Sequence, residues 1–127
     1  MPGKHLYEYA VIRLVPRVER EEFLNVGVIL FCKNGKYLNC QHYLDPEKLK
    51  LFSTELDIQE IEKNLNAFGK ICSGAKDGGS VAQWETPDRF RWLTAQRSSS
   101  IQTSRPHNGF SNDLDATLER LFDELVL

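Results

Sequence analysis

The sequence is poor in the residues that mark disulfide-stapled, metal-bound and membrane-spanning proteins. It has three cysteines, an odd number, and they show no C-x-x-C spacing, so neither a disulfide framework nor a zinc knuckle is predicted. No apolar run approaches the roughly 18 residues of a membrane span, and residues 1–5 are not followed by the apolar stretch of a secretory signal. We therefore expect a cytoplasmic protein that does not bind membranes, with its cysteines as small core residues.

An excess of positive charge is also missing. Sixteen basic residues face eighteen acidic ones, which gives a net charge of −2. A nucleic-acid partner is therefore not predicted, because such partners call for a clustered basic surface. The hydrophobic fraction of 41% and the charged fraction of 27% are those of an ordinary globular chain, and 127 residues suit one domain.

Three apolar stretches predict strands. Residues 6–15 are apolar on both alternating faces, which indicates a strand covered on both sides. Residues 25–32 and 36–44 flank Asn34-Gly35, the strongest short hairpin signal. The first half of the chain therefore predicts a strand followed by a hairpin.

The register of this hairpin follows from its loop. If Asn34 and Gly35 are the two loop residues, Cys32 faces Tyr37 and Cys40 faces Ile29. Cys32 and Cys40 are then not cross-strand partners. A disulfide between them is not expected.

Capping residues and apolar periodicity predict helices in the rest of the chain. The first three helices run from Asp45-Pro46 through Phe52, from Asp57 and Glu60 to Gly74, and from Thr86-Pro87 past Phe90 and Leu93. The last helix begins at Asn112 or Asp113 and is expected to bury Leu114, Leu118, Leu121, Phe122 and Leu125. Residues 73–80 have the composition of a flexible internal loop. Residues 98–104 are typical of a polar strand or an extended loop around Ile101. We predict one α+β domain over residues 1–127, a small, mostly antiparallel sheet with helices packed on one face.

The segment 97–109 is dense in hydrogen-bond donors and almost free of carboxylates. Arginine binds phosphate bidentately, hydroxyls and glycine-adjacent amides add donors, and a histidine can transfer a proton near neutral pH. The candidate ligand-binding residues here are Arg97, Ser98, Arg105, His107 and Gly109. The competing interpretation, which we prefer, is a solvated loop whose hydroxyls satisfy their own backbone.

A second candidate lies before the second strand, where Glu21-Glu22 precede Asn25 and Gly27. The carboxylates could act as a base or hold a metal, but charged residues at a strand entry usually stay in solvent, so a structural role is the better interpretation. No metal site and no cofactor are predicted. A serine-hydrolase turn of the G-x-S-x-G type is absent from the sequence.

Three aromatic residues surround the third predicted helix. Trp84, Phe90 and Trp92 lie near Arg89 and Arg91, and aromatic rings beside arginines can stack on nucleic-acid bases. Rings around a short helix more often belong to a core, and we interpret them so.

Several segments taken together resemble a known family. They are residues 9–16 (YAVIRLVP), 22–30 (EFLNVGVIL), 91–98 (RWLTAQRS) and 103–109 (TSRPHNG), and their order and spacing resemble the bacterial Domain-of-Unknown-Function 3037 family from about Leu6 to Val126. The resemblance implies one site made from Arg13, Glu22, Asn25, Gly27, Arg97, Ser98, His107, Gly109 and Asp113, if the sheet brings these residues together. The chain departs from the family pattern at Gln96, where a proline is usual, and at Arg20-Glu21, where an Arg-Gly pair is usual, which puts local loop geometry in doubt.

The family has no established activity, so the resemblance leaves two functions open. The first is a non-catalytic interaction or regulatory module, the accessory partner of a HipA-like kinase-fold protein, that docks through a sheet edge or through residues 97–109. The alternative is a phosphate-ester or nucleotide-binding enzyme in which Arg97 and Arg105 clamp an anion, His107 transfers a proton, and Glu22 or Asp113 orients the histidine or binds Mg²⁺. Direct DNA binding is the weakest of the hypotheses, because no helix-turn-helix is recognisable.

Overall fold

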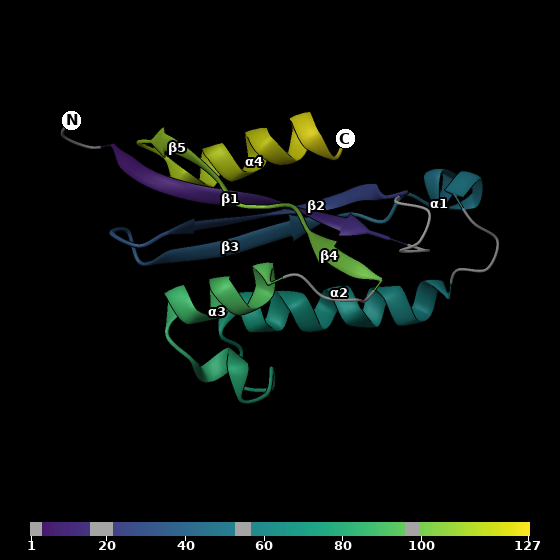
Figure 1. Cartoon of the computed structure of the whole chain (residues 1–127), viewed down its shortest axis with the longest axis horizontal. Coiled ribbons are helices and arrows are strands. Elements are labelled where there is room, and N and C mark those ends of the chain that lie inside the picture. The colour runs from purple at the N-terminus through teal and green to yellow at the C-terminus, as the bar shows by residue number, and fades with distance from the viewer. Residues whose placement is uncertain (1–3, 16–21, 53–56, 96–99) are drawn as a thin grey trace.

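The computed structural model describes residues 4–15, 22–52, 57–95 and 100–127, with backbone only at 51 and 52. Its elements, in chain order, are β1 (His5–Leu14), β2 (Leu24–Cys32), β3 (Tyr37–His42), α1 (Pro46–Phe52), α2 (Ile58–Ser73), the 3-10 helix η2 (Val81–Gln83), α3 (Thr86–Thr94), β4 (Ile101–Thr103), β5 (His107–Ser111) and α4 (Leu114–Leu125) (Figure 1). All strand pairs among these elements are antiparallel. The predicted α+β class is confirmed.

β1 is the central strand of the sheet. It pairs with β2 on one side, and β2 pairs in turn with β3. On its other side β1 pairs with both β4 and β5, with Ile12 opposite Thr103 and Tyr9 opposite His107. Residues 101–111 therefore form one interrupted edge of the sheet (Figure 1).

The β2–β3 hairpin has the predicted register. Cys32 lies opposite Tyr37 and Ile29 lies opposite Cys40. The Lys36 N–H donates to the Lys33 carbonyl at 3.2 Å and closes the turn around Asn34 and Gly35. The turn is not of the I′ type that Asn-Gly favours, because the residue with a left-handed backbone is Lys36 (φ 51°) and not Gly35. The three cysteines are free thiols, as expected.

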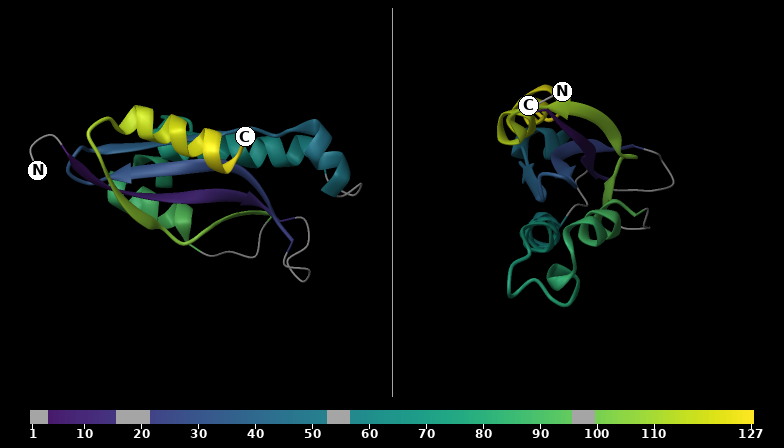
Figure 2. Two further views of the ribbon diagram at one scale, coloured as in Figure 1. Left: turned by 90° about the horizontal axis from the view of Figure 1, so that it is seen from above. Right: turned by 90° about the vertical axis from the view of Figure 1, so that its left-hand side faces the viewer.

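Helices cover both faces of the sheet, which corrects the prediction of helices on one face (Figure 2). β2 explains the second layer, since every one of its residues from 26 to 32 is buried. Val26, Ile29 and Phe31 face a core shared with α2 and α3. Val28, Leu30 and Cys32 face a second core with Leu118, Leu121 and Val126. A strand that is apolar on both faces needs a cover on each side, and α4 supplies the second one.

The helix termini follow the capping signals in the sequence. Asp57 accepts from the Glu60 N–H at 3.2 Å to start α2, and Gly74 ends that helix with φ 71°. Asp113 accepts from the Ala116 N–H at 3.1 Å to start α4. These N-cap and C-cap predictions are confirmed. None of the described helices is long and apolar enough to cross a membrane.

Two details near α2 and α3 complete the description. The predicted cap at Thr86 is one residue off, because Thr86 is the first residue of α3. Residues after α2 form hydrogen-bonded turns, with Lys70 Nζ 2.7 Å from Asp77 Oδ2 and the Gly78 N–H donating to the Ala75 carbonyl at 3.0 Å. The predicted mobility of residues 73–80 stays a prediction.

Candidate functional site

Arg13 and Asn25, both predicted as ligand-binding residues, are cross-strand partners beside a β-bulge. The Asn25 amide Nδ2 donates to the Leu125 carbonyl at 3.1 Å, so Asn25 completes the last turn of α4. The Arg13 guanidinium lies 4.1 Å from the centre of the Phe23 ring, a cation–π geometry. Asn25 Oδ1 and Arg13 Nε are buried, and neither has a hydrogen-bond partner among the described residues. These two atoms at the junction of β1, β2 and α4 are therefore available to hydrogen-bond a water molecule or a ligand.

A small cleft of about 300 Å³ opens beside Asn25. It is lined by Leu24, Asn25, Tyr43, Asp45, Lys48, Val126 and Leu127. The Lys48 Nζ donates to the Val126 carbonyl at 3.3 Å and so ties α1 to the end of α4. The cleft offers one ammonium and one carboxylate, which suits water or a small polar molecule rather than a phosphate ester.

Gly27 has a structural explanation. It lies opposite Ile12 on β1 and His42 on β3. A Cβ at this position would overlap the Gln41 carbonyl and press on both neighbours at 3.0 Å. Only glycine lets the three strands approach this closely.

The polar segment 97–109 is in part the edge of the sheet. The Ser104 N–H donates to the Val11 carbonyl at 2.8 Å, and its hydroxyl accepts from the Val11 N–H at 2.9 Å. Arg105 and Pro106 lie between β4 and β5, and both are exposed. Arg97 and Ser98 lie outside the described residues.

His107, Gly109 and Asp113 lie along β5 and at the start of α4. The exposed His107 packs its ring 5.3 Å from the ring of Tyr9. Gly109 lies opposite Tyr7, and Asp113 is the N-cap of α4. Two of these three predicted residues therefore have roles in the fold.

The described candidates do not gather around one point. Arg13 lies four positions beyond Tyr9, the partner of His107, on β1, and a strand rise of about 3.3 Å per residue puts roughly 13 Å between the two levels. Glu22 is exposed just before β2. Among the residues that the structure describes, no three histidine, cysteine or carboxylate side chains meet in the way a metal ion requires.

Sequence comparison places the chain in a family. The model of a family described as protein of unknown function (DUF3037) matches residues 9–126, nearly the whole chain. The chain belongs to this family. No curated protein and no solved structure shows significant similarity to this DUF3037 member. The resemblance that the sequence motifs indicated is confirmed.

The aromatic cluster of this DUF3037 protein is only partly core. Phe90 is buried and stacks on Phe31 with ring centres 4.8 Å apart, and Trp92 packs partly against the same core. Trp84 is 46% exposed, so the core interpretation is wrong for this residue. A short helix shows too few turns for its sequence to separate an inward ring from an outward one.

The sequence reasoning missed an exposed apolar pair on the sheet. Leu6 and Phe110 are cross-strand partners, and they are 52% and 69% exposed. The signal available in the sequence was a single phenylalanine within the polar stretch 107–111. One apolar residue among polar ones does not by itself predict a strand.

Proposed function

We propose that this DUF3037 protein is a cytoplasmic, non-catalytic protein-interaction module that docks an extended segment of a partner protein along β5. The observation that carries the proposal is the exposed pair of Leu6 and Phe110 on the edge of the sheet. Within the described residues β5 pairs with β1 alone. Addition of a strand to such an edge is a common mode of peptide recognition.

Hydrogen bonds at the neighbouring residues indicate which backbone groups of β5 point outward. Val11 and Val15 direct backbone groups toward the β4–β5 edge, through bonds to Ser104 and Ser100. Because orientation alternates along an antiparallel strand, Tyr9 and Tyr7 point the same way and bond to His107 and Gly109. The N–H and C=O groups of Asn108 and Phe110 then face away from the sheet, available to an incoming strand.

The side chains at this edge favour a particular kind of segment. Phe110 and Leu6 share one face and present a continuous apolar contact to a residue of the incoming strand. The exposed Asn108 lies on the same face and offers a polar contact, whereas His107 lies on the opposite face, against Tyr9. We expect an extended partner segment that places one large apolar side chain beside Phe110. The family resemblance makes a HipA-like kinase-fold protein the first partner to test.

The test uses the backbone of Asn108. Asn108→Pro removes the outward N–H at an edge position where proline is tolerated, whereas Asn108→Ala keeps that N–H and serves as the matched control. The tagged chain is expressed in its own host with a photo-crosslinking residue at position 110, and the same residue at Glu119 on α4 gives the background.

The expected result is one protein crosslinked from position 110 in the wild-type and Asn108→Ala backgrounds, and lost with Asn108→Pro and with Leu6→Asp. Thermal unfolding of each variant checks the fold. Equal capture by the wild type, Asn108→Ala, Asn108→Pro and Leu6→Asp would show that β5 is not the docking edge. A co-purified nucleotide or phosphorylated metabolite without a protein would favour the enzyme that uses Arg97, Arg105 and His107.

A further inference from the structure

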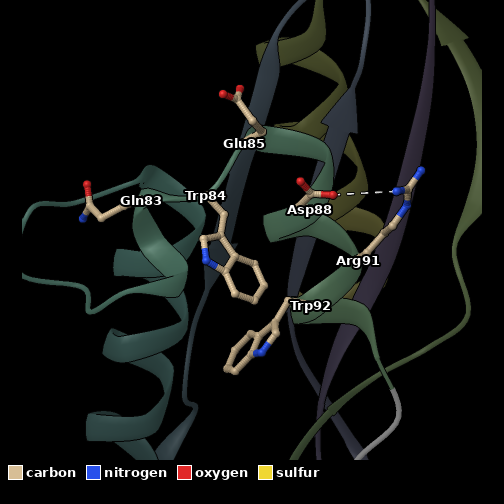
Figure 3. A pocket seen from close by; sticks show the side chains of 6 residues that line it. All are labelled: Gln83, Trp84, Glu85, Asp88, Arg91 and Trp92. Atoms are coloured by element: carbon tan, nitrogen blue, oxygen red, sulfur yellow. Dashed lines mark ion pairs between the residues drawn. The ribbon is translucent and has the colours of Figure 1, made fainter.

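Both tryptophans of the chain line one open hollow on the side of the sheet that α2 and α3 cover. The hollow has a volume of about 700 Å³ and is lined by Gln83, Trp84, Glu85, Asp88, Arg91 and Trp92. Figure 3 shows the two indoles directed into the same space between η2 and α3, while the side chains of Gln83 and Glu85 point away from it. Two tryptophans at one opening are typical of binding sites rather than of ordinary surface.

Hydrogen bonds hold Trp84 in place. The backbone N–H of Trp84 donates to the Val81 carbonyl at 3.0 Å, and the backbone carbonyl of Trp84 accepts from Arg89 Nη1 at 3.2 Å. The same guanidinium reaches the Ala82 carbonyl and the Thr86 hydroxyl, each at 3.4 Å. Arg89 thus ties η2 to α3, so the backbone on both sides of the hollow is fixed before any ligand arrives.

Asp88 is the carboxylate closest to the indoles, because the side chain of Glu85 points away from the hollow (Figure 3). Arg91 contributes one guanidinium to the same lining. The Arg91 Nη1 lies 3.8 Å from Asp88 Oδ1, and these two side chains are 79% and 58% exposed, so the ion pair is weak and Asp88 can change partner. The indole face is the aromatic surface that attracts cations most strongly.

A nucleobase is the competing occupant, since bases stack on tryptophan as well. A nucleotide stacked there would bring its phosphate next to the Asp88 carboxylate, where the charges repel. A cation gains from both the indoles and the Asp88 carboxylate. We therefore favour the cation.

We propose that the hollow binds a methylated ammonium group between the indoles of Trp84 and Trp92, with the Asp88 carboxylate as its counter-ion. The group can belong to a free quaternary ammonium compound or to a methylated lysine side chain of another protein. This site is separate from β5 and does not depend on the docking function proposed above.

Tryptophan fluorescence reads the site directly, because the chain has no tryptophan elsewhere. The intact protein is titrated with choline chloride at constant ionic strength, and with 3,3-dimethylbutan-1-ol, the uncharged carbon analogue of choline. The expected result is a saturable fluorescence change with choline and binding about threefold to tenfold weaker, or none, with the alcohol. Equal binding of both compounds, or no saturable change with choline, would overturn the proposal.

Charge variants give a second readout. Asp88→Asn should weaken choline binding about threefold to tenfold, and Arg91→Ala should strengthen it because Asp88 loses its competing partner. Asp123→Asn, an exposed carboxylate on α4 across the sheet, is the matched control and should bind choline as the wild type does. If Asp88→Asn and Asp123→Asn bind choline equally well, the counter-ion role of Asp88 is wrong.

A third titration identifies the source of the ammonium group. A short peptide with one trimethyllysine is compared with choline and with the same peptide carrying unmodified lysine. Binding of the trimethyllysine peptide about tenfold tighter than choline supports a protein side chain, through contacts outside the hollow. Equal binding supports a free quaternary ammonium compound, and failure of both ligands overturns the site.

Discussion

The phenol ring of Tyr7 covers the backbone of Gly109, its cross-strand partner on β5. A Cβ atom at position 109 would overlap the ring. The buried Tyr7 side chain belongs to the core between the sheet and α4. The glycine that the family resemblance marks as a site residue therefore has a packing reason to be glycine.

Gly109→Ala should destabilise the protein by about 1–3 kcal/mol, the usual cost of overpacking. The measurement is the free energy of unfolding in urea. In a Tyr7→Val background the same substitution should cost much less, because the clash with the ring is gone. The same cost in both backgrounds would contradict the ring-over-glycine explanation.

Gly69→Ala is the matched control for this substitution. Gly69 lies within α2, and a Cβ there meets nothing within 4 Å. Alanine in a helix interior is favoured over glycine by roughly 0.5–1 kcal/mol, so this variant should be more stable than the wild type.

Asn25→Ala should lower the free energy of unfolding by about 1 kcal/mol, because the Leu125 carbonyl loses its 3.1 Å hydrogen bond. Amide exchange should rise in the last turn of α4 and remain unchanged in α2. Asn66→Ala, an exposed position on α2, is the control. Unchanged exchange at the end of α4 would show that Asn25 does not hold that helix.

Cys40 should be the first cysteine to react with iodoacetamide in the native protein. A hydrogen bond from the Cys72 thiol lowers the pKa of Cys40, and the same bond, together with burial, raises the pKa of Cys72. The thiolate is the reactive form, and Cys40 is also more accessible than the buried Cys32 and Cys72. Mass spectrometry of the alkylated peptides measures the order.

The role of Cys72 is tested by its removal. In Cys72→Ala the pKa of Cys40 should rise, so that alkylation at a fixed, mildly alkaline pH slows and the pH–rate profile moves to higher pH. Cys32→Ala, on the other face of the sheet, should leave the profile in place. Identical profiles in all three proteins would exclude the thiol pair.

His42 should make the protein less stable in mild acid. Burial lowers the pKa of its imidazole below 6.5, so the unfolded chain binds a proton more readily than the folded one. Stability from this group is complete above the unfolded pKa and falls as the pH drops through about 6.5 toward the folded pKa. The effect should be small, because much of the side chain is exposed.

Urea unfolding at several pH values between 7.5 and 5 tests this expectation, and NMR titration of the imidazole gives its pKa directly. His42→Gln should flatten the pH dependence of stability over this interval. A midpoint at or above 6.5 for His42 would contradict the argument.

Local signals predicted most of the elements. The carboxylates of Asp57 and Asp113 cap helices within three residues of themselves, Gly74 ends α2, and Asn34-Gly35 sets the β2–β3 register. Each of these interactions joins neighbours in the chain, so a short stretch of sequence contains both partners.

Strand pairings and helix packing between distant parts of the chain could not be predicted from the sequence. β5 is a strand because Tyr7, near the other end of the chain, pairs with Gly109. The position of α4 on the second face depends on Val28 and Leu30, which are buried only once the whole sheet has formed. The same holds for the candidate site, because whether Arg13 meets Asn25 or His107 is decided by strand register and not by spacing in the chain.

The two sides of β1 are completed at very different times during synthesis. β2 follows β1 directly, but β4 and β5 lie near the end of the described chain. Until residues 101–111 leave the ribosome, the nascent protein carries a central strand with one open edge. Such a topology folds slowly and is prone to aggregation while incomplete. Truncations that end before β4 should therefore need chaperone assistance or form insoluble aggregates, because they leave one edge of β1 unpaired and also lack α4, the cover of the second face.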